Sequence, residues 1–161
     1  ALDDGPVLTW RRGDPPPAIW QQHVSSGGTV SAHNAAFEYW ALLLVLGPRY
    51  GWAVPAIAQM RDTMAQAAAV SIPQALNGAA RAMGLDQEKD KSGQRLIRKF
   101  CLPRKARKGE VPGRLYWIEP EDDPEDFDRL VSYCAQDVVV ERALRKLLVP
   151  LSAAEQDVWV F

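Results

Sequence analysis

The sequence predicts an α/β fold with a small mixed sheet flanked by helices, and three observations support this prediction. The chain has 161 residues, which fits one domain with a sizeable core. Segments with helical periodicity outnumber those with strand character. The β-prone runs TVSAH (29–33) and QMRDTM (59–64) are scattered between the predicted helices, an order typical of α/β domains.

The elements are justified by local signals along the chain. ALDDGPVLTW is expected to form a strand, a turn and a second strand, and Pro15-Pro16-Pro17 forces a loop. Gly47-Pro48 is expected to end the helix that begins at Asn34. Ser152 and Glu155 have the spacing of a capping box and predict a last helix. The other predicted elements are helices at about 18–24, 63–70, 73–83, 92–101 and 124–148, and an extended run at 114–120.

The charges are unevenly distributed, although the net charge is only −1. Residues 81–114 contain eleven lysines and arginines against four acids, and residues 119–128 contain seven acids and no base. Such blocks commonly form solvated faces. The basic block could instead follow a phosphate backbone, and composition does not choose between these interpretations.

The ends of the chain and its cysteines bear on context. The chain begins at Ala1, inside the expected hairpin, and stops within a short helix, so we expect a fragment of a longer protein. The longest apolar run is far below the ~20 residues that span a bilayer, and no secretion signal is evident. Two cysteines do not form a disulfide framework. We expect a cytoplasmic setting (bacterial, or that of the host if the protein is phage-encoded), with no membrane partner and no small-molecule cofactor.

Two polar pairs are candidates for function. Asn34 and Glu38 lie four positions apart where a predicted strand meets a helix. Asn34 could simply cap that helix while Glu38 faces water, or both could lie in a cleft at the strand end, where α/β sheets hold ligands. Tyr133 and Asp137 lie in the predicted last long helix, and their spacing places them on one helical face. This pair alone is a weak signal, and the alternative is a surface Asp beside a half-buried Tyr.

Five segments in order and spacing resemble a known family. They are HNAAFE, DTMAQA, IPQALNGAARAMGL, KDKSGQRLIRKF and YCAQDVVVERALRKL, within residues 29–148. This order is similar to that of the 3′–5′ proofreading exonuclease domains of bacteriophage-type family-A DNA polymerases, members of the DEDD exonuclease superfamily. The resemblance implies an RNase H-like fold, an exonuclease domain at 1–148, and at 149–161 the start of a linker or helix that leads to a polymerase domain.

The resemblance also implies roles for individual residues. Glu38, Tyr133 and Asp137 would be catalytic, with Glu38 and Asp137 holding two divalent metal ions (Mg²⁺ or Mn²⁺) and Tyr133 orienting the attacking water. These residue types suit the chemistry, because two metals can generate hydroxide and stabilise the leaving oxygen, and Mg²⁺ prefers oxygen ligands. Asp62 also matches the family, but as a strand-to-helix cap.

The substrate would be the 3′ end of single-stranded DNA, and the partner a polymerase domain in the same parent chain. The candidate substrate-binding residues are His33, Asn34, Phe37, Arg104 and Lys105. For His33 a structural role is the favoured alternative, and Phe37 is the candidate for stacking on a terminal base.

Two departures from the family pattern leave a second hypothesis open. Glu38 stands where the family has Asp, and its side chain is longer by one CH₂. No Asp-x-Glu precedes Asn34, so two of the four expected acids are absent, and we expect the first strand to be missing from this chain. The chain by itself is therefore expected to be inactive. The alternative function is a non-catalytic domain with a degenerate site that binds single-stranded DNA or supports a polymerase.

Overall fold

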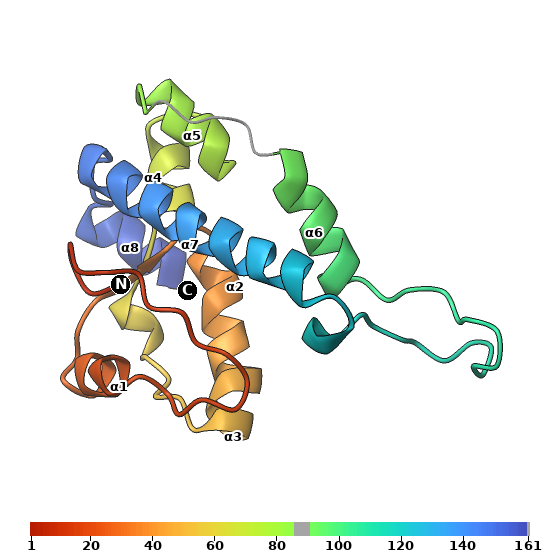
Figure 1. Cartoon of the computed structure of the whole chain (residues 1–161). Helices are drawn as coiled ribbons and strands as arrows, with labels where there is room; N and C mark the ends of the chain where they lie inside the picture. The colour runs from red at the N-terminus through yellow and green to blue at the C-terminus, as the bar shows by residue number, and fades with distance from the viewer. Residues whose placement is uncertain (86–90, 161) are drawn as a thin grey trace. The chain divides into compact units, whose positions relative to one another are not determined.

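The computed structural model describes residues 1–85 and 91–160, without the side chains of 91 and 92. The chain divides into two compact units. The first unit comprises Ala1–Gln87 and Val138–Phe161, and the second comprises Glu88–Asp137. The fold is mixed α/β, as the sequence predicts, and Figure 1 labels its helices. No described helix is both long and apolar enough to cross a membrane.

The first unit combines short helices with a small parallel sheet. Strand β1 pairs with β2 in the register Val30↔Met60, Ser31↔Arg61 and Ala32↔Asp62. Both strands therefore run in the same direction, whereas a mixed sheet was predicted. The elements of this unit are α1 (Ala18–Ser25), β1 (Val30–Ala32), α2 (Ala35–Ala41), α3 (Gly47–Tyr50), β2 (Met60–Asp62), α4 (Thr63–Ala69), α5 (Leu76–Ala82), the C-terminal part of α7 (Pro124–Leu147) and α8 (Ala153–Val160).

The opening segment is not the predicted hairpin. A turn does form at residues 3–5, with Gly5 N–H donating to the Leu2 carbonyl at 2.8 Å, but no strand flanks it. The Arg142 guanidinium donates to the carbonyl oxygens of Asp3 at 3.3 Å and Gly5 at 2.6 Å. These acceptors are therefore satisfied by a distant side chain rather than by a neighbouring strand.

The helix that begins after Asn34 also continues further than predicted. A π-helical stretch, Leu42–Leu46, follows α2, and α3 then carries the chain through Gly47-Pro48. Pro48 falls in the first turn of α3, where the missing N–H and the fixed φ are tolerated. The helix ends instead at Gly51, whose φ of 72° is the left-handed conformation common at helix C-termini.

The core of the first unit lies between α4, α5 and the C-terminal part of α7. Ala67 and Ala79 are fully buried, and Leu144 and Leu148 fill the space against them. Small side chains at the helix contacts let the helix axes approach closely, and the leucines supply most of the buried apolar area. The partly buried residues around this cluster are Ile72, Leu76, Met83 and Leu85.

The second unit pairs α6 (Lys91–Cys101) with the N-terminal part of α7. Phe100 and Phe127 meet edge to face, with ring centroids 5.3 Å apart. The buried Asp126 receives Lys99 Nζ at 2.7 Å and Arg95 Nη1 at 3.1 Å, and Lys99 also pairs with Asp123. Part of the basic block therefore pairs with the acidic block, an outcome that neither interpretation of the charges anticipated.

Candidate functional site

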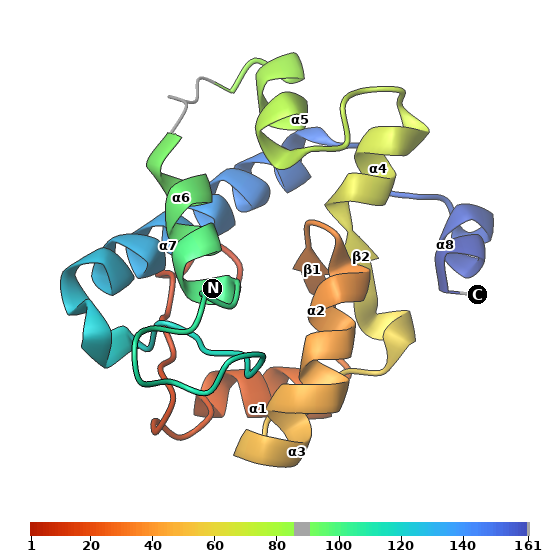
Figure 2. The ribbon, with the colours of Figure 1, turned by 90° about the vertical axis from the view of Figure 1, so that its right-hand side faces the viewer.

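The candidate site of the first unit lies at the C-terminal ends of β1 and β2. Because the strands are parallel and Ala32 pairs with Asp62, both chains leave the sheet at the same edge. β1 leads through His33 and Asn34 into α2, and β2 leads directly into α4 (Figure 2). Ligands in α/β sheets commonly bind at this edge.

The Asp62 carboxylate organises this edge. The residue is 2% exposed, and its Oδ1 accepts the backbone N–H groups of Asn34 at 3.0 Å and Met64 at 2.9 Å. Its Oδ2 accepts the indole N–H of Trp159, in α8, at 3.2 Å. The bond from Met64 confirms the predicted cap of α4. Asp62 therefore connects three segments that are far apart in sequence.

Asn34 is held in an unusual backbone conformation at this edge. Its φ of 70° and ψ of 51° lie in the left-handed region, which Asn tolerates better than most residues. Its side chain makes no capping hydrogen bond to α2 and is exposed. The interpretation of Asn34 as a simple cap is therefore wrong. Its exposed side-chain amide is therefore available to a ligand.

Glu38, one turn into α2, does not face water. It is partly buried, and among the described atoms its Oε2 has no hydrogen-bond partner. Burial, together with the nearby charges of Asp62 and Glu141, raises the pKa of this carboxyl to about 6. A carboxylate that is desolvated and surrounded by other acids is poorly stabilised by the protein alone, so its ionised form would gain from a bound cation.

Glu141 is a site residue that the sequence analysis missed. It lies one helical turn beyond Asp137 in α7, and this i+4 spacing was the available signal. Burial raises the pKa of its carboxyl, while Arg145 and a hydrogen bond from the Thr63 side chain oppose that rise. Its Oε1 is buried and has no partner among the described atoms. The strand-end region thus contains two carboxylates with unsatisfied oxygens.

His33 and Phe37 differ in how available they are. The His33 ring lies between Thr63 Oγ1, 3.0 Å from Nδ1, and the Gln74 carbonyl oxygen, 2.6 Å from Nε2. Both ring nitrogens therefore have protein partners, which favours the structural alternative. The Phe37 side chain is 67% exposed and is free to stack. Substrate contact by either residue stays a prediction.

Tyr133 and Asp137 lie one turn apart on α7 in the second unit. The Tyr133 ring packs directly against the backbone of Gly93, in α6. Gly93, within the segment KSGQ, was not predicted as functional, although a glycine inside a helix is a signal of close approach. The convergence of Tyr133 and Asp137 with Glu38 stays a prediction.

The donor chemistry of these residues suits a hard divalent cation. Carboxylate oxygens are the ligands that Mg²⁺ and Mn²⁺ prefer, and Glu38 Oε2 is an unsatisfied one. Within the described residues, however, no three acidic, histidine or cysteine side chains are arranged to hold a metal ion. Glu38 and Asp137 can therefore be metal ligands only in combination with further donors.

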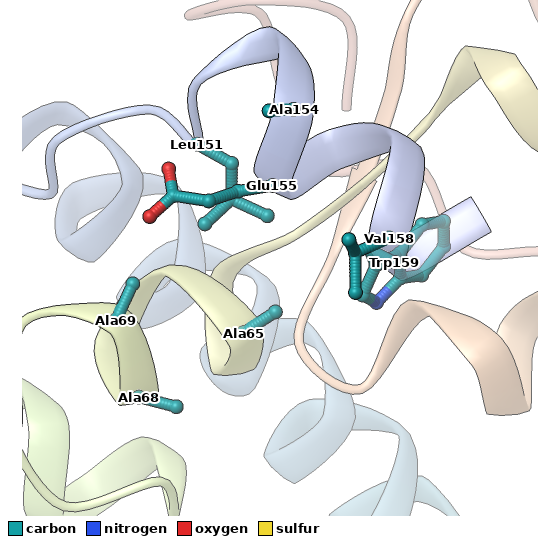
Figure 3. Close-up of a pocket in the computed structure, with 8 residues that line it drawn as sticks. All are labelled: Ala65, Ala68, Ala69, Leu151, Ala154, Glu155, Val158 and Trp159. Atoms are coloured by element: carbon teal, nitrogen blue, oxygen red, sulfur yellow. The ribbon is translucent and has the colours of Figure 1, made fainter. Parts of the chain in front are cut away.

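An apolar hollow of about 500 Å³ lies between α4 and α8 (Figure 3). Alanines of α4 form one wall, and Leu151, Val158 and Trp159 form most of the other. Its only charged lining residue is Glu155, whose carboxylate accepts the Ser152 backbone N–H at 2.8 Å and so completes the predicted capping box. The hollow is not lined by any of the predicted site residues.

Comparison with known proteins gives one informative match. Over 164 aligned residues, which cover 98% of this chain, it is 34% identical to a DNA polymerase of Bacillus phage SP02. The chain is similar to part of a phage DNA polymerase. It spans about a quarter of that relative's length. No profile of a known protein family matches the chain, and no solved structure matches it. The polymerase relationship agrees with the coarser part of the sequence prediction.

Proposed function

We propose that this chain is part of the 3′–5′ exonuclease region of a DNA polymerase, with an RNase H-like fold, and that the complete region hydrolyses phosphodiester bonds at the 3′ ends of single-stranded DNA. The observation that carries the proposal is Glu38. It is a partly buried carboxylate with an unsatisfied oxygen and a pKa raised to about 6, at the shared end of two parallel strands. The similarity to a phage DNA polymerase supplies the context.

Each residue has a distinct role in this proposal. Bound divalent cations would supply a hydroxide nucleophile at neutral pH and stabilise the leaving oxygen. Glu38 and Asp137 would hold the cations together with further oxygen donors. Asn34 would hold the terminal nucleotide through its side-chain amide, and Tyr133 would orient the attacking water through its phenol. Asp62 would fix the backbone of Asn34 and so keep the edge of the site in place.

The alternative, a non-catalytic domain that binds single-stranded DNA or supports a polymerase, has one observation in its favour. Within the described ranges no complete set of metal ligands is present. The two hypotheses differ in one measurable property. In the presence of Mg²⁺ or Mn²⁺, an exonuclease must release mononucleotides from the 3′ end of the DNA. A binding domain must leave the bound oligonucleotide intact.

The test is digestion of 5′-labelled single-stranded DNA by the parent protein, extended upstream of Ala1 to include an Asp-x-Glu strand, and by the 161-residue chain. The extended protein should shorten the DNA from its 3′ end, and the 161-residue chain should show little or no digestion. Asp137→Ala should abolish digestion, because a metal ligand is lost. Tyr133→Phe should slow it less, since the metals still generate hydroxide. Failure of the extended protein to digest would favour the binding domain.

Substitutions at Glu38 provide the sharpest discrimination. Glu38→Asp should retain or improve the rate if this position is a metal-site carboxylate. Glu38→Ala should lose most of the rate, because the carboxylate that would hold a cation is removed. Asp157→Ala is the matched control, because Asp157 is an exposed acid of the same unit. Full activity in Glu38→Ala would remove Glu38 from the site.

A further inference from the structure

A long loop follows α6 in the second unit, and we call residues 102–117 the basic arm. Figure 1 shows it as two limbs that extend from the end of α6 and return. The limbs meet where Arg104 N–H donates to the Tyr116 carbonyl oxygen at 2.8 Å, in an isolated antiparallel bridge. The Tyr116 hydroxyl accepts the Val111 N–H at 3.1 Å. The arm is therefore a folded loop with its own hydrogen bonds.

An ion pair inside the loop holds this conformation. Arg104 donates through both terminal nitrogens to the two oxygens of Glu110, each at 2.7 Å, and its guanidinium lies 5.1 Å from the centre of the Tyr116 ring. Glu110 also accepts the Arg107 backbone N–H at 2.6 Å. The side-chain hydrogen bond from Arg104 and the bond from Arg107 lower the pKa of Glu110 to about 2. Arg104 is thus engaged within the arm.

The remaining cations of the arm are on its surface, and the Arg114 guanidinium lies 5.8 Å from the centre of the Tyr116 ring. Lys105, Arg107, Lys108 and Arg114 are exposed. In the described part of the chain, no acidic side chain forms an ion pair with any of these four. The cations Arg95 and Lys99 of α6, by contrast, pair with Asp126. Within the described residues, the basic block therefore contains two α6 cations that pair with Asp126 and four arm cations that form no ion pair.

Apolar groups stand among these charges. Trp117 is 44% exposed and follows Tyr116 at the base of the arm, and Val111 and Leu115 are exposed as well. An exposed indole beside unpaired cations is the combination used to bind single-stranded nucleic acid, in which bases stack on aromatic rings while cations contact phosphates.

We propose that the basic arm is a binding surface for single-stranded DNA. Lys105, Arg107 and Lys108 contact backbone phosphates, Trp117 stacks on a base, and the Arg104–Glu110 pair keeps the arm folded so that these groups face outward. The proposal rests on the proposed function for the identity of the nucleic acid. It reassigns Arg104, predicted to bind substrate, to a positioning role, and it keeps Lys105 as a phosphate contact.

The first experiment measures the affinity of the 161-residue chain for fluorescent oligo(dT) and for a mixed-sequence oligonucleotide, by anisotropy at several salt concentrations without divalent metal. Arg107→Ala with Lys108→Ala should weaken binding to both DNAs alike. It should also flatten the dependence of log affinity on log salt by about 1.4, since each phosphate contact contributes ~0.7 on single strands. The matched control, Arg49→Ala with Arg81→Ala, removes two exposed cations from the first unit. An equal change in both double variants would overturn the proposal.

Two further variants test the stacking and the fold of the arm. Trp117→Ala should weaken binding roughly 5- to 100-fold, whereas Trp117→Phe should retain most of it. Glu110→Gln makes the arm more positive, so a diffuse charge effect would tighten binding. If the ion pair positions the arm, Glu110→Gln weakens binding despite the added positive charge. Tighter binding by Glu110→Gln would overturn the positioning role of Arg104. Thermal unfolding of each variant should match that of the wild type, because these side chains lie outside the apolar core.

Failure of this inference is distinguishable from failure of the proposed function. If the extended protein digests DNA and the arm variants bind as the wild type does, the exonuclease stands and the arm is not its DNA-binding surface. If the arm variants change binding and salt dependence as expected but no protein digests DNA, the basic arm is a DNA-binding surface and the proposed exonuclease function is wrong. If the wild-type chain does not bind single-stranded DNA at all, the proposal for the basic arm is overturned.

Discussion

The contact between Gly93 and the Tyr133 ring predicts the effect of adding a single methyl group. A Cβ atom at Gly93 would lie 2.3 Å from Tyr133 Cε2, 2.5 Å from Cδ2 and 2.6 Å from Cζ. All three distances are far below van der Waals contact, and the three atoms belong to one rigid ring. The Gly93→Ala variant must therefore displace the ring or separate α6 from α7.

The net effect follows from two opposing terms. Alanine in a helix interior is favoured over glycine by about 1 kcal/mol. Inserting a methyl group into a well-packed contact costs about 1–3 kcal/mol. We therefore expect Gly93→Ala to lower the free energy of unfolding by up to about 2 kcal/mol, although helix propensity alone predicts stabilisation. Urea unfolding of the wild type and the variant measures the difference.

A second background isolates the contact. In Tyr133→Ala the ring is absent, so Gly93→Ala should there stabilise the protein by about 1 kcal/mol. The reversal of sign between the two backgrounds is the specific expectation. Stabilisation of similar size in both would refute the reasoning, because the ring would then not be in contact with Gly93. In the extended protein, Gly93→Ala should also slow DNA digestion at least as much as Tyr133→Phe, since it displaces the whole ring.

Three other predictions concern stability. Asp62→Ala should lower the free energy of unfolding by about 3–5 kcal/mol, because three donors lose their acceptor. Trp159→Phe removes one of these donors and should lower it by about 1 kcal/mol. A loss below about 1 kcal/mol in urea unfolding of Asp62→Ala would contradict this prediction. The side-chain hydrogen bond from Lys99 and other cations hold the pKa of Asp126 well below its ordinary ~3.9. The stabilisation by ionised Asp126 should therefore be complete above about pH 4 and be lost as the pH falls further. The difference in melting temperature between the wild type and Asp126→Asn should accordingly shrink in acid, and a constant difference would contradict the prediction. In metal-free buffer the raised pKa of Glu38 acts in the opposite sense, because ionisation between pH 4.5 and about 6 destabilises the folded state. After allowance for partial exposure, Glu38→Gln should thus stabilise the protein by about 1 kcal/mol at pH 8 and not at pH 4. An equal gain at both pH values would argue against burial of the charge.

Local signals predicted most of the helices, because their causes lie within a few residues. Ser152 and Glu155 bond to each other as a capping box, and the long helix predicted from Pro124 runs to Leu147. The two short strands were found for the same reason: β-prone residues lie between clear helical segments. The predictions failed at ALDDGPVLTW, where the deciding partner, Arg142, is more than 130 residues away. A hairpin signal in the sequence contains no information about such a donor.

The candidate site was predictable in residue type but not in environment. The spacing of Asn34 and Glu38 indicated a functional pair, yet the raised pKa of Glu38 depends on burial and on the charges of Asp62 and Glu141, which come near it only in the folded unit. Glu141 was missed because its i+4 spacing from Asp137 does not by itself distinguish it from an exposed glutamate of a charged helix. Gly93 was missed because its importance depends on which ring lies against it. Tertiary proximity determines all three.

The hydrogen bonds of α8 have a consequence for where the protein can be divided. The sequence suggests a domain boundary at Leu148, which would leave α8 outside. In the structure, Trp159 donates to Asp62, and Gln156 donates to the Met60 carbonyl oxygen at 3.3 Å. A chain truncated at Leu148 would lose both of these bonds to β2 and one wall of the apolar hollow beside α4. Limited proteolysis should therefore spare the segment after Leu148 for as long as β2 stays folded, and a minimal stable fragment should extend at least to Val160.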